Sequence, residues 1–394
     1  DAGVRSSTSP ALELLTDDGE VAGARGVNRR SGQRWEVRAG AVVIATGGCA
    51  FLSRALGCNV LTGDGNLLAA EVGASLSGME FSNAYGIAPA FASVTKAAFY
   101  RWATFSYEDG SPIEGAGSAR GRSVIARTLL TQPVYCVLDQ AGAGLREALR
   151  ASQPNFFLPF DRRGIDPLTQ RFQVTLRLEG TVRGTGGIRI ASEACATDVP
   201  GLYAAGDAAT RELICGGFTG GGSHNAAWAM SSGHWAGLGA AQHGKRVGPS
   251  LATRRVQGAG VAALHGARPL DSESVVAAVQ GEVFPYDKNL FRTTRGLHDS
   301  LARLDGLWSE LKQTQAVATA RHITRGRESA AMVATARFMY RSALARTETR
   351  GMHKHVDFPH QDPAQTRRLV TSGLDHIEVR PEGSASVDHV AAAE

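Results

Sequence analysis

The sequence lacks a paired-cysteine motif, a long apolar run and a basic cluster, and each absence excludes a class of protein. Its five cysteines form no Cys-x-x-Cys pair, which argues against a zinc knuckle or a disulfide framework and favours a reducing, cytoplasmic compartment. The longest uncharged stretch, residues 214–244, is interrupted by glycines and polar residues, so we expect no transmembrane segment. The 42 Lys and Arg residues are scattered against 37 Asp and Glu residues, which does not indicate nucleic-acid binding.

Two further motifs are missing. No apolar segment follows the first five residues, so no signal peptide is expected. No Gly-x-Gly-x-x-Gly turn occurs, although this turn usually binds the phosphates of a dinucleotide. What the sequence does have is 43% hydrophobic residues, which is typical of a folded protein, and 47 clustered glycines, which indicate close approaches of the backbone.

The first part of the chain predicts β-structure. Residues 11–15, 20–27 and 33–38 alternate with turn signals, of which Asp17-Asp18-Gly19 is the strongest, and predict a β-meander. Residues 41–48 form a short β-branched run that predicts a buried, parallel strand.

The rest of the chain mixes helices and strands. A helix is predicted over residues 67–74, and a second buried strand over residues 201–207. The composition of residues 77–184 is typical of an inserted domain. The remaining predicted helices cover residues 122–130, 144–151, 225–242, 290–313 and 330–345, and the segment after Pro359 is a polar tail.

Both buried strands end in glycine, which is the feature that first suggests a cofactor. The first ends in Ala45, Thr46, Gly47 and Gly48, and the second in Gly206 and Asp207. Ligands of α/β sheets bind at the carboxyl ends of parallel strands, where glycine lets the backbone approach them. A carboxylate such as Asp207 can accept hydrogen bonds from ligand hydroxyls. The alternative is a tight strand-to-helix turn with a capping aspartate.

Three polar clusters are further candidates. The glycine-rich stretch 215–225 leads into a helix, whose N-terminus stabilises negative charge, and it contains His224, a general acid or a plain loop histidine. Arg122 and Arg127 at a helix start can hold a carboxylate or form a solvated helix end. His353 and His355 have a poor spacing for a metal pair, so no metal is expected.

At these motifs the chain resembles the fumarate reductase / succinate dehydrogenase flavoprotein family, which includes aspartate oxidase and adenylylsulfate reductase α subunits. The motifs occur in family order over residues 40 to 360, and together they are specific. They are Ala45-Thr-Gly-Gly48, Thr62-Gly-Asp-Gly-Asn-Leu-Leu-Ala-Ala-Glu-Val-Gly-Ala74, Met79-Glu80-Phe81, Arg122-Ser-Val-Ile-Ala-Arg127, Thr185-Gly-Gly-Ile188, Gly201-Leu-Tyr-Ala-Ala-Gly-Asp207 and Arg346-Thr-Glu-Thr-Arg-Gly-Met-His353.

The resemblance implies an α/β fold: a Rossmann-like FAD-binding domain, incomplete at its N-terminus, with an inserted α+β capping domain and a C-terminal helical domain. The implied boundaries are 1–76 and 185–246 for the FAD-binding domain, 77–184 for the capping domain, 247–358 for the helical domain and 359–394 for the tail. The FAD contacts that it implies come from Ala45, Thr46, Gly47, Gly48, Thr62, Gly63, Asp64, Gly206, Asp207, Asn225, Ser231 and Ser232.

The sequence also departs from the family pattern. Ser82-Asn83-Ala84 stands where the family has Phe-His-Pro, and Val182 and Arg183 lie where it has a histidine. The family's carboxylate-binding arginine falls on Ala226. Plain fumarate or succinate is therefore not the expected substrate, and covalent flavin attachment is in doubt.

The implied activity is hydride transfer between FAD and a carbon–carbon bond next to a carboxylate or carbonyl of a small molecule. Arg122 matches the family's proton-delivering arginine, His224 is the alternative acid, and Arg183 replaces the lost carboxylate clamp. The alternative is a non-catalytic or split chain, in which a partner polypeptide supplies the ADP-binding half of the site; an electron-transfer subunit is a further possible partner. A nicotinamide dehydrogenase is less favoured, because the fingerprint is absent.

Overall fold

The first strands form the antiparallel meander that the sequence predicts. The computed structural model describes residues 9–95, 97–118, 120–218, 222–315 and 319–384. Asp18 and Gly19 both have positive φ, 49° and 76°, as a two-residue hairpin turn requires. The strands of this sheet follow the order β12-β1-β2-β3 and comprise β1 (Ala11–Asp17), β2 (Glu20–Val27), β3 (Arg34–Arg38) and β12 (Gln257–Gly258).

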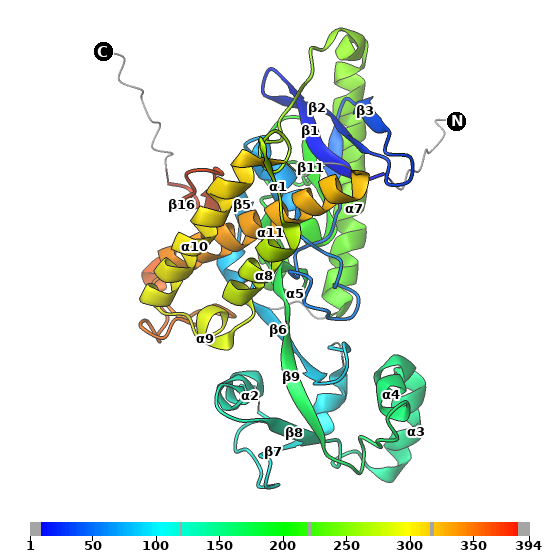
Figure 1. Cartoon of the computed structure of the whole chain (residues 1–394), viewed down its shortest axis with the longest axis vertical. Coiled ribbons are helices and arrows are strands. Elements are labelled where there is room, and N and C mark those ends of the chain that lie inside the picture. The colour runs from blue at the N-terminus through cyan, green and yellow to red at the C-terminus, as the bar shows by residue number, and fades with distance from the viewer. Residues whose placement is uncertain (1–8, 96, 119, 219–221, 316–318, 385–394) are drawn as a thin grey trace.

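The two predicted buried strands pair in parallel. In β4 (Val42–Ile44) and β11 (Leu202–Ala204), Val42 lies opposite Leu202 and Ile44 opposite Ala204. The long helix α7 (Gly222–Val247) contacts both strands, and α1 (Asp64–Glu71) packs near them (Figure 1). A core of small and branched side chains, including Ile44, Leu68 and Ile188, holds these elements together.

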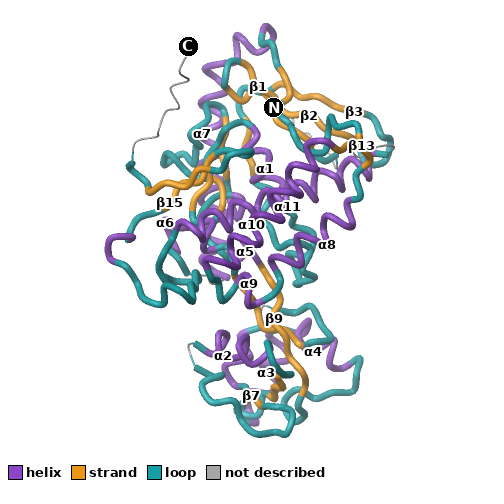
Figure 2. The backbone as a smooth tube through the Cα atoms, turned by 60° about the vertical axis from the view of Figure 1, so that its left-hand side comes forward, coloured by secondary structure: helices purple, strands orange, loops and turns teal. Residues whose placement is uncertain are grey.

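A separate lobe lies at one end of the molecule, joined to the body by two long strands (Figures 1 and 2). Its antiparallel sheet has the order β6-β9-β8-β7, and phenylalanines of its helices fill its core. The lobe falls within the residues predicted to form the capping domain, and we call it the cap. Its elements are β6 (Ala84–Pro89), β7 (Thr104–Ser106), β8 (Val134–Val137), β9 (Phe172–Glu179), α2 (Gly121–Leu129), α3 (Ala143–Ser152) and α4 (Pro154–Asp161).

A helical region packs across the body. Helix α11 (Ala320–Ala345) is buried along most of its length and contacts α1, α8 (Ser272–Val283) and α10 (Thr294–Gln313). Its residues 329–340 are all buried, so neighbouring elements must cover this stretch on every side. Side-chain caps fix the starts of these helices: Asp271 accepts from the backbone of α8, and Thr293 from that of α10.

The segment expected to be a polar tail instead contributes strands. β15 (Leu369–Ser372) pairs with β5 (Leu76–Ser77) and with β16 (Glu378–Pro381) in the sheet β10-β5-β15-β16. Leu369, Val370 and Thr371 are buried there, although so short a run carries little sequence signal. The remaining elements are η1 (Met79–Phe81), η2 (Ala98–Trp102), α5 (Gly180–Arg183), β10 (Gly187–Ile188), η3 (Gly206–Ala208), α6 (Glu212–Cys215), η4 (Gly248–Thr253), β13 (Arg268–Pro269), α9 (Tyr286–Asn289), β14 (Thr314–Gln315) and η5 (Pro363–Gln365).

A buried ion pair joins α1 to α11. Arg327 donates to the carboxylate of Glu71 at 2.7 Å and to the carbonyl of Ala262 at 2.9 Å. Both side chains are almost fully buried, at 4% and 1% exposure. Removal of one partner would leave the other charge buried without compensation.

We therefore expect Arg327→Met to lower the free energy of unfolding by about 3–5 kcal/mol. Arg325→Met is the matched control, because Arg325 lies on the same helix, is half exposed, and approaches Glu328 only at 3.6 Å. Urea unfolding monitored by circular dichroism measures both. Equal losses in the two variants would contradict a structural role for the buried pair.

Candidate functional site

The ends of β4 and β11 lie side by side, which confirms the expected juxtaposition of the two glycine-ended strands. The amide of Ala205 donates to the carbonyl of Ile44 at 2.9 Å, so the pairing continues to the last residues of both strands. Ala45 and Thr46 are exposed beyond that point. The carboxyl edge of the parallel pair is thus open, as a ligand site in this fold class requires.

Helix α7 fixes the position of Gly206. The amide of Gly206 donates to Ser232 Oγ at 2.9 Å, and its carbonyl accepts from Trp228 Nε1 at 3.0 Å. Ser232 was a predicted cofactor contact, but its hydroxyl is buried and also donates to the carbonyl of Trp228. Ser232 therefore binds the backbone of Gly206 and holds the segment that follows β11 in place.

Asp207 has a partner that the sequence did not predict. Arg211, one turn later, donates to the Asp207 carboxylate and to the carbonyls of Thr181 at 2.8 Å, Val182 at 3.0 Å and Gly184. The guanidinium is buried, which lowers its pKa, and Asp207 offsets that effect. Nothing in the local sequence marks Arg211, because the carbonyls that it binds come from a distant segment.

The turn that begins α1 packs against the first strand end. Thr62 Oγ1 donates to Asp64 at 2.6 Å, and a Cβ added to Gly65 would meet Thr46 Oγ1 at 2.4 Å. Gly48 and Gly63 likewise make room for neighbouring protein atoms, since a Cβ at either would lie within 2.6 Å of a threonine hydroxyl. These glycines serve close packing of the chain on itself.

Some of the predicted FAD contacts have groups available to a ligand. Gly206 has φ +61, and a Cβ there would meet only Ala229 Cβ, at 3.9 Å, so one face of this residue is open. Asn225 Oδ1 is buried among the described residues without a hydrogen-bond partner, as expected of a group that awaits a ligand donor. Together with exposed Ala45 and Thr46, these groups would hold the ring and ribityl part of FAD. Residues 219–221 of the glycine-rich turn lie outside the described residues.

A cavity of about 710 Å³ lies where the cap meets the body; we call it the cleft. It contains two of the three predicted catalytic residues, Arg122 and Arg183, but not His224, which is exposed in the first turn of α7. Arg127 is also absent from the cleft and stacks its guanidinium over the ring of Phe291 at 4.6 Å. The residues that line the cleft are Asn83, Ala84, Tyr85, Arg120, Arg122, Ser123, Leu176, Glu179, Arg183, Phe218, Leu290, Thr349, Gly351, Met352, Lys354, Pro359, His360 and Gln361.

Helix α5 connects the cleft to both strand ends. Thr181 exchanges hydrogen bonds with Cys49, through its own amide at 3.0 Å and its hydroxyl at 2.7 Å, and its carbonyl accepts from Arg211. Two residues later, Arg183 lies in the cleft and donates to buried Glu179 at 3.0 Å. The segment that carries the cleft arginine is therefore fixed directly against the predicted cofactor edge.

Beside the cleft, buried groups hold the loop that follows α11. Arg292 donates to His353 Nδ1 at 2.8 Å, so His353 carries its proton on Nε2 and donates to the carbonyl of Arg346 at 3.0 Å. Burial and the charge of Arg292 hold the pKa of His353 well below its usual value. His353 is therefore a neutral structural residue, and the described residues contain no group of three or more potential metal ligands.

Two buried carboxyl groups, Glu80 and Glu212, lie close enough to influence each other. Arg346 donates to Glu80 at 2.7 Å, whereas Thr210 donates to Glu212 at 3.3 Å. Burial raises the pKa of Glu212 to about 8, and the charge of Glu80 adds to this effect. Burial also raises the pKa of Glu80.

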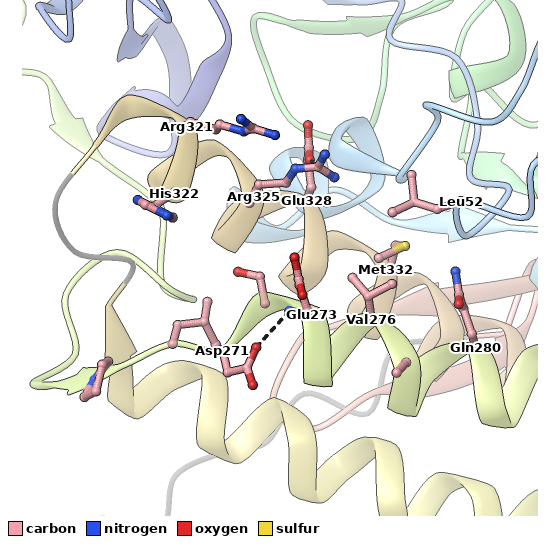
Figure 3. Close-up of a pocket in the computed structure, with 14 residues that line it drawn as sticks. Leu52, Asp271, Glu273, Val276, Gln280, Arg321, His322, Arg325, Glu328 and Met332 are labelled. Carbon is pink, nitrogen blue, oxygen red and sulfur yellow. Dashed lines mark hydrogen bonds and ion pairs between the residues drawn. The ribbon is translucent and has the colours of Figure 1, made fainter.

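A second cavity of about 820 Å³ lies between α8 and the start of α11 (Figure 3). Of its charged groups, Asp271 caps α8, and Glu328 lies near Arg325 and Arg29. It shares no lining residue with the cleft. It also contains none of the three predicted catalytic residues.

With this geometry in view, two segments match known families. Residues 6–85 match the FAD binding domain, and residues 281–381 match the fumarate reductase flavoprotein C-terminal region. The L-aspartate oxidase of Mycobacterium tuberculosis is 28% identical over 359 residues, covering 86% of this chain and 63% of that protein. The fumarate reductase flavoprotein subunit of the same species is 27% identical over 409 residues, covering 89% and 67%.

Solved structures show the same fold. A quinol-fumarate reductase solved with menaquinol molecules superimposes with a TM-score of 0.76 at 19% identity, covering 97% of this chain and 73% of that chain. Adenylylsulfate reductase from Archaeoglobus fulgidus gives 0.71 at 17% identity, covering 96% and 72%.

These findings confirm the predicted resemblance: the chain is similar to the fumarate reductase and aspartate oxidase flavoproteins. They also confirm the fold class and FAD as the cofactor of this family of oxidoreductases. The chain spans 63% of the length of the aspartate oxidase that it matches. No helix among the described residues is both long and apolar enough to cross a membrane.

Asp207→Asn tests the pairing with Arg211. The variant keeps the shape but removes the charge facing a buried guanidinium, so we expect the free energy of unfolding to fall by about 2–3 kcal/mol. If Asp207 also binds a flavin hydroxyl, Asp207→Ala weakens flavin retention by about ten-fold. Asp18→Asn, in an exposed hairpin turn, is the control for the stability measurement. Unchanged stability of Asp207→Asn would show that the carbonyls of Thr181, Val182 and Gly184 alone compensate the buried charge of Arg211.

Glu212 predicts a pH dependence. Its pKa is raised in the folded chain, so the native state binds a proton that the unfolded chain releases, and stability falls as pH rises from about 4.5 toward 8. The slope for one proton is at most about 1.4 kcal/mol per pH unit. Glu212→Gln removes this contribution, so its stability relative to the parent should increase between pH 5.5 and 7.5 in urea titrations. A constant difference across that range would contradict the raised pKa.

Proposed function

We propose that this chain carries the catalytic half of an FAD-dependent oxidoreductase that acts on a carbon–carbon bond next to a carboxylate or carbonyl. The observation that supports this most directly is the link made by α5. In this short helix Thr181 binds Cys49, next to the predicted end of the first strand, and Arg211, the partner of Asp207, while Arg183 lines the cleft. A substrate in the cleft would therefore lie next to the predicted flavin edge.

Bound FAD supplies the chemistry of hydride transfer. The residues of the chain bind and orient the substrate and move the proton. Arg183, steadied by Glu179, is suited to bind the carboxylate, because a guanidinium can donate two parallel hydrogen bonds to it. Arg122 lines the cleft, and loss of solvent around its guanidinium together with the charge of Arg183 lowers its pKa. That shift favours Arg122 as the group that donates a proton to the substrate carbon.

The substrate we propose is larger than fumarate or succinate. Asn83 and Ala84 line the cleft in place of the family's histidine and proline, and Ala226 is exposed on α7, outside the cleft lining. The cleft of about 710 Å³ also has apolar walls, from Leu176, Leu290 and Met352. These features support a ligand with a hydrocarbon body as well as a carboxylate.

Arg122→Lys tests the proton role. Lysine keeps the positive charge but lacks the planar guanidinium and the position of its N–H donors. Turnover should therefore fall by about 100-fold or more while flavin content is unchanged. Arg127→Lys is the matched control, since Arg127 lies on the same helix and contacts Phe291 outside the cleft. Flavin absorbance and steady-state kinetics measure the two properties. Normal turnover in Arg122→Lys would move the acid role to His224.

A second proposal concerns the ADP half of the cofactor site. Among the described residues, β4 pairs only with β11, which leaves its other edge open, and Val43 is 38% exposed. Beside it, α7 exposes Met230 at 77% and Leu238 at 52%. Parallel sheets are normally covered on both faces. We propose that a strand and a helix supplied by a partner chain or a longer polypeptide cover this surface and bind the ADP moiety.

FMN and FAD distinguish this proposal from a self-sufficient chain. If the chain provides only the flavin side of the site, FMN and FAD should bind with equal affinity, because the ADP part of FAD finds no contacts. Isothermal titration of the purified chain with each flavin measures the ratio. FAD binding that is at least ten-fold tighter would mean that the chain alone completes the site.

A further inference from the structure

The cationic side chains of the cleft form two separate pairs. All four line the cleft, where the charge of Arg183 acts on Arg122 and the charge of Arg120 acts on Lys354. The first pair is partly balanced by Glu179, which binds Arg183 at 3.0 Å. No carboxylate within the described ranges forms an ion pair with Arg120 or Lys354. Arg120 and Lys354 therefore leave more positive charge without a carboxylate partner than Arg122 and Arg183 do.

The two members of this pair belong to different parts of the molecule. Arg120 immediately precedes α2 of the cap, where its carbonyl accepts from the amide of Ser123 at 2.9 Å. Lys354 lies in the loop after α11, on the body. Two like charges thus face each other across the junction of cap and body, where their repulsion opposes closure.

The backbone of Lys354 is held firmly in this position. Its carbonyl accepts from the amide of Arg292 at 3.1 Å, and the Arg292 carbonyl accepts from Val356 at 2.7 Å. The preceding residue, His353, is clamped between Arg292 and Arg346. The loop therefore presents the half-buried Lys354 side chain to the cleft. Burial and the charge of Arg120 lower the pKa of Lys354, a cost that a bound anion would reverse.

We propose that Arg120 and Lys354 form a second anion subsite, which binds a distal carboxylate or phosphate of the substrate and draws the cap onto the body. The inference rests on the proposed function for its substrate. The apolar walls of Leu176, Leu290 and Met352 suit a hydrocarbon chain that separates this group from the one bound by Arg183. An anion between two cations turns their repulsion into attraction, so the substrate itself would favour closure.

Adipate and hexanoate test the subsite, because they share a six-carbon chain and differ in one terminal carboxylate. Binding is measured on the full chain without flavin, from the thermal unfolding midpoint at constant ionic strength. In the parent, adipate should bind about ten-fold more tightly than hexanoate. Arg120→Gln and Lys354→Gln should each abolish that preference, and the double variant should lose nothing more. Lys245→Gln, at the end of α7, is the control.

Lys354→Glu makes the test independent of misfolding. The new carboxylate would pair with Arg120, so the unfolding midpoint without ligand should rise while the adipate preference disappears. A preference retained in Arg120→Gln and Lys354→Gln would overturn the subsite, whether or not the protein is an active flavoenzyme. A preference lost in both variants would support the subsite by itself, because this measurement needs no flavin, whereas the proposed function is tested separately by the turnover of Arg122→Lys.

Discussion

Buried arginines that bind backbone carbonyls hold the site together. Arg211 joins Asp207, at the end of β11, to the carbonyls of residues 181–184, while Arg292 and Arg346 fix His353 and the loop beyond it. Burial lowers the pKa of Arg292 to about 10, so it remains a cation at neutral pH. Such charges are stable in the interior only because several acceptors surround each one. The relative placement of strand ends, α5 and cleft wall depends on these contacts.

The elements with strong local signals could be predicted from the sequence. The meander, the parallel strands β4 and β11 and the main helices follow from alternation, β-branched runs and turn residues, although both strands end a few residues earlier than predicted, at Ile44 and Ala204. The strands of residues 369–381 could not, because their few apolar residues become meaningful only when β5 provides an edge. Arg211 was missed for the same reason, since its acceptors lie about thirty residues earlier in the chain.

Residue chemistry alone was a weaker guide to the candidate site. Arg122 and Arg183 both line the cleft. Arg127, on the same helix as Arg122, instead stacks on the ring of Phe291, and His224 is not among the residues that line the cleft. Ser232 has the right chemistry for a ligand contact, yet its hydroxyl is occupied by Gly206 and Trp228. No sequence pattern marks Lys354, because the proposed subsite forms only when the fold brings it near Arg120, more than two hundred residues earlier in the chain.

The open edge of β4 and the apolar face of α7 also bear on how the chain behaves in solution. An unpaired strand edge beside exposed methionine and leucine side chains is a template for pairing with another chain. Because β4 is only three residues long, such pairing would be weak and would grow with protein concentration. Self-association of the purified chain would then report how much of this surface is still uncovered.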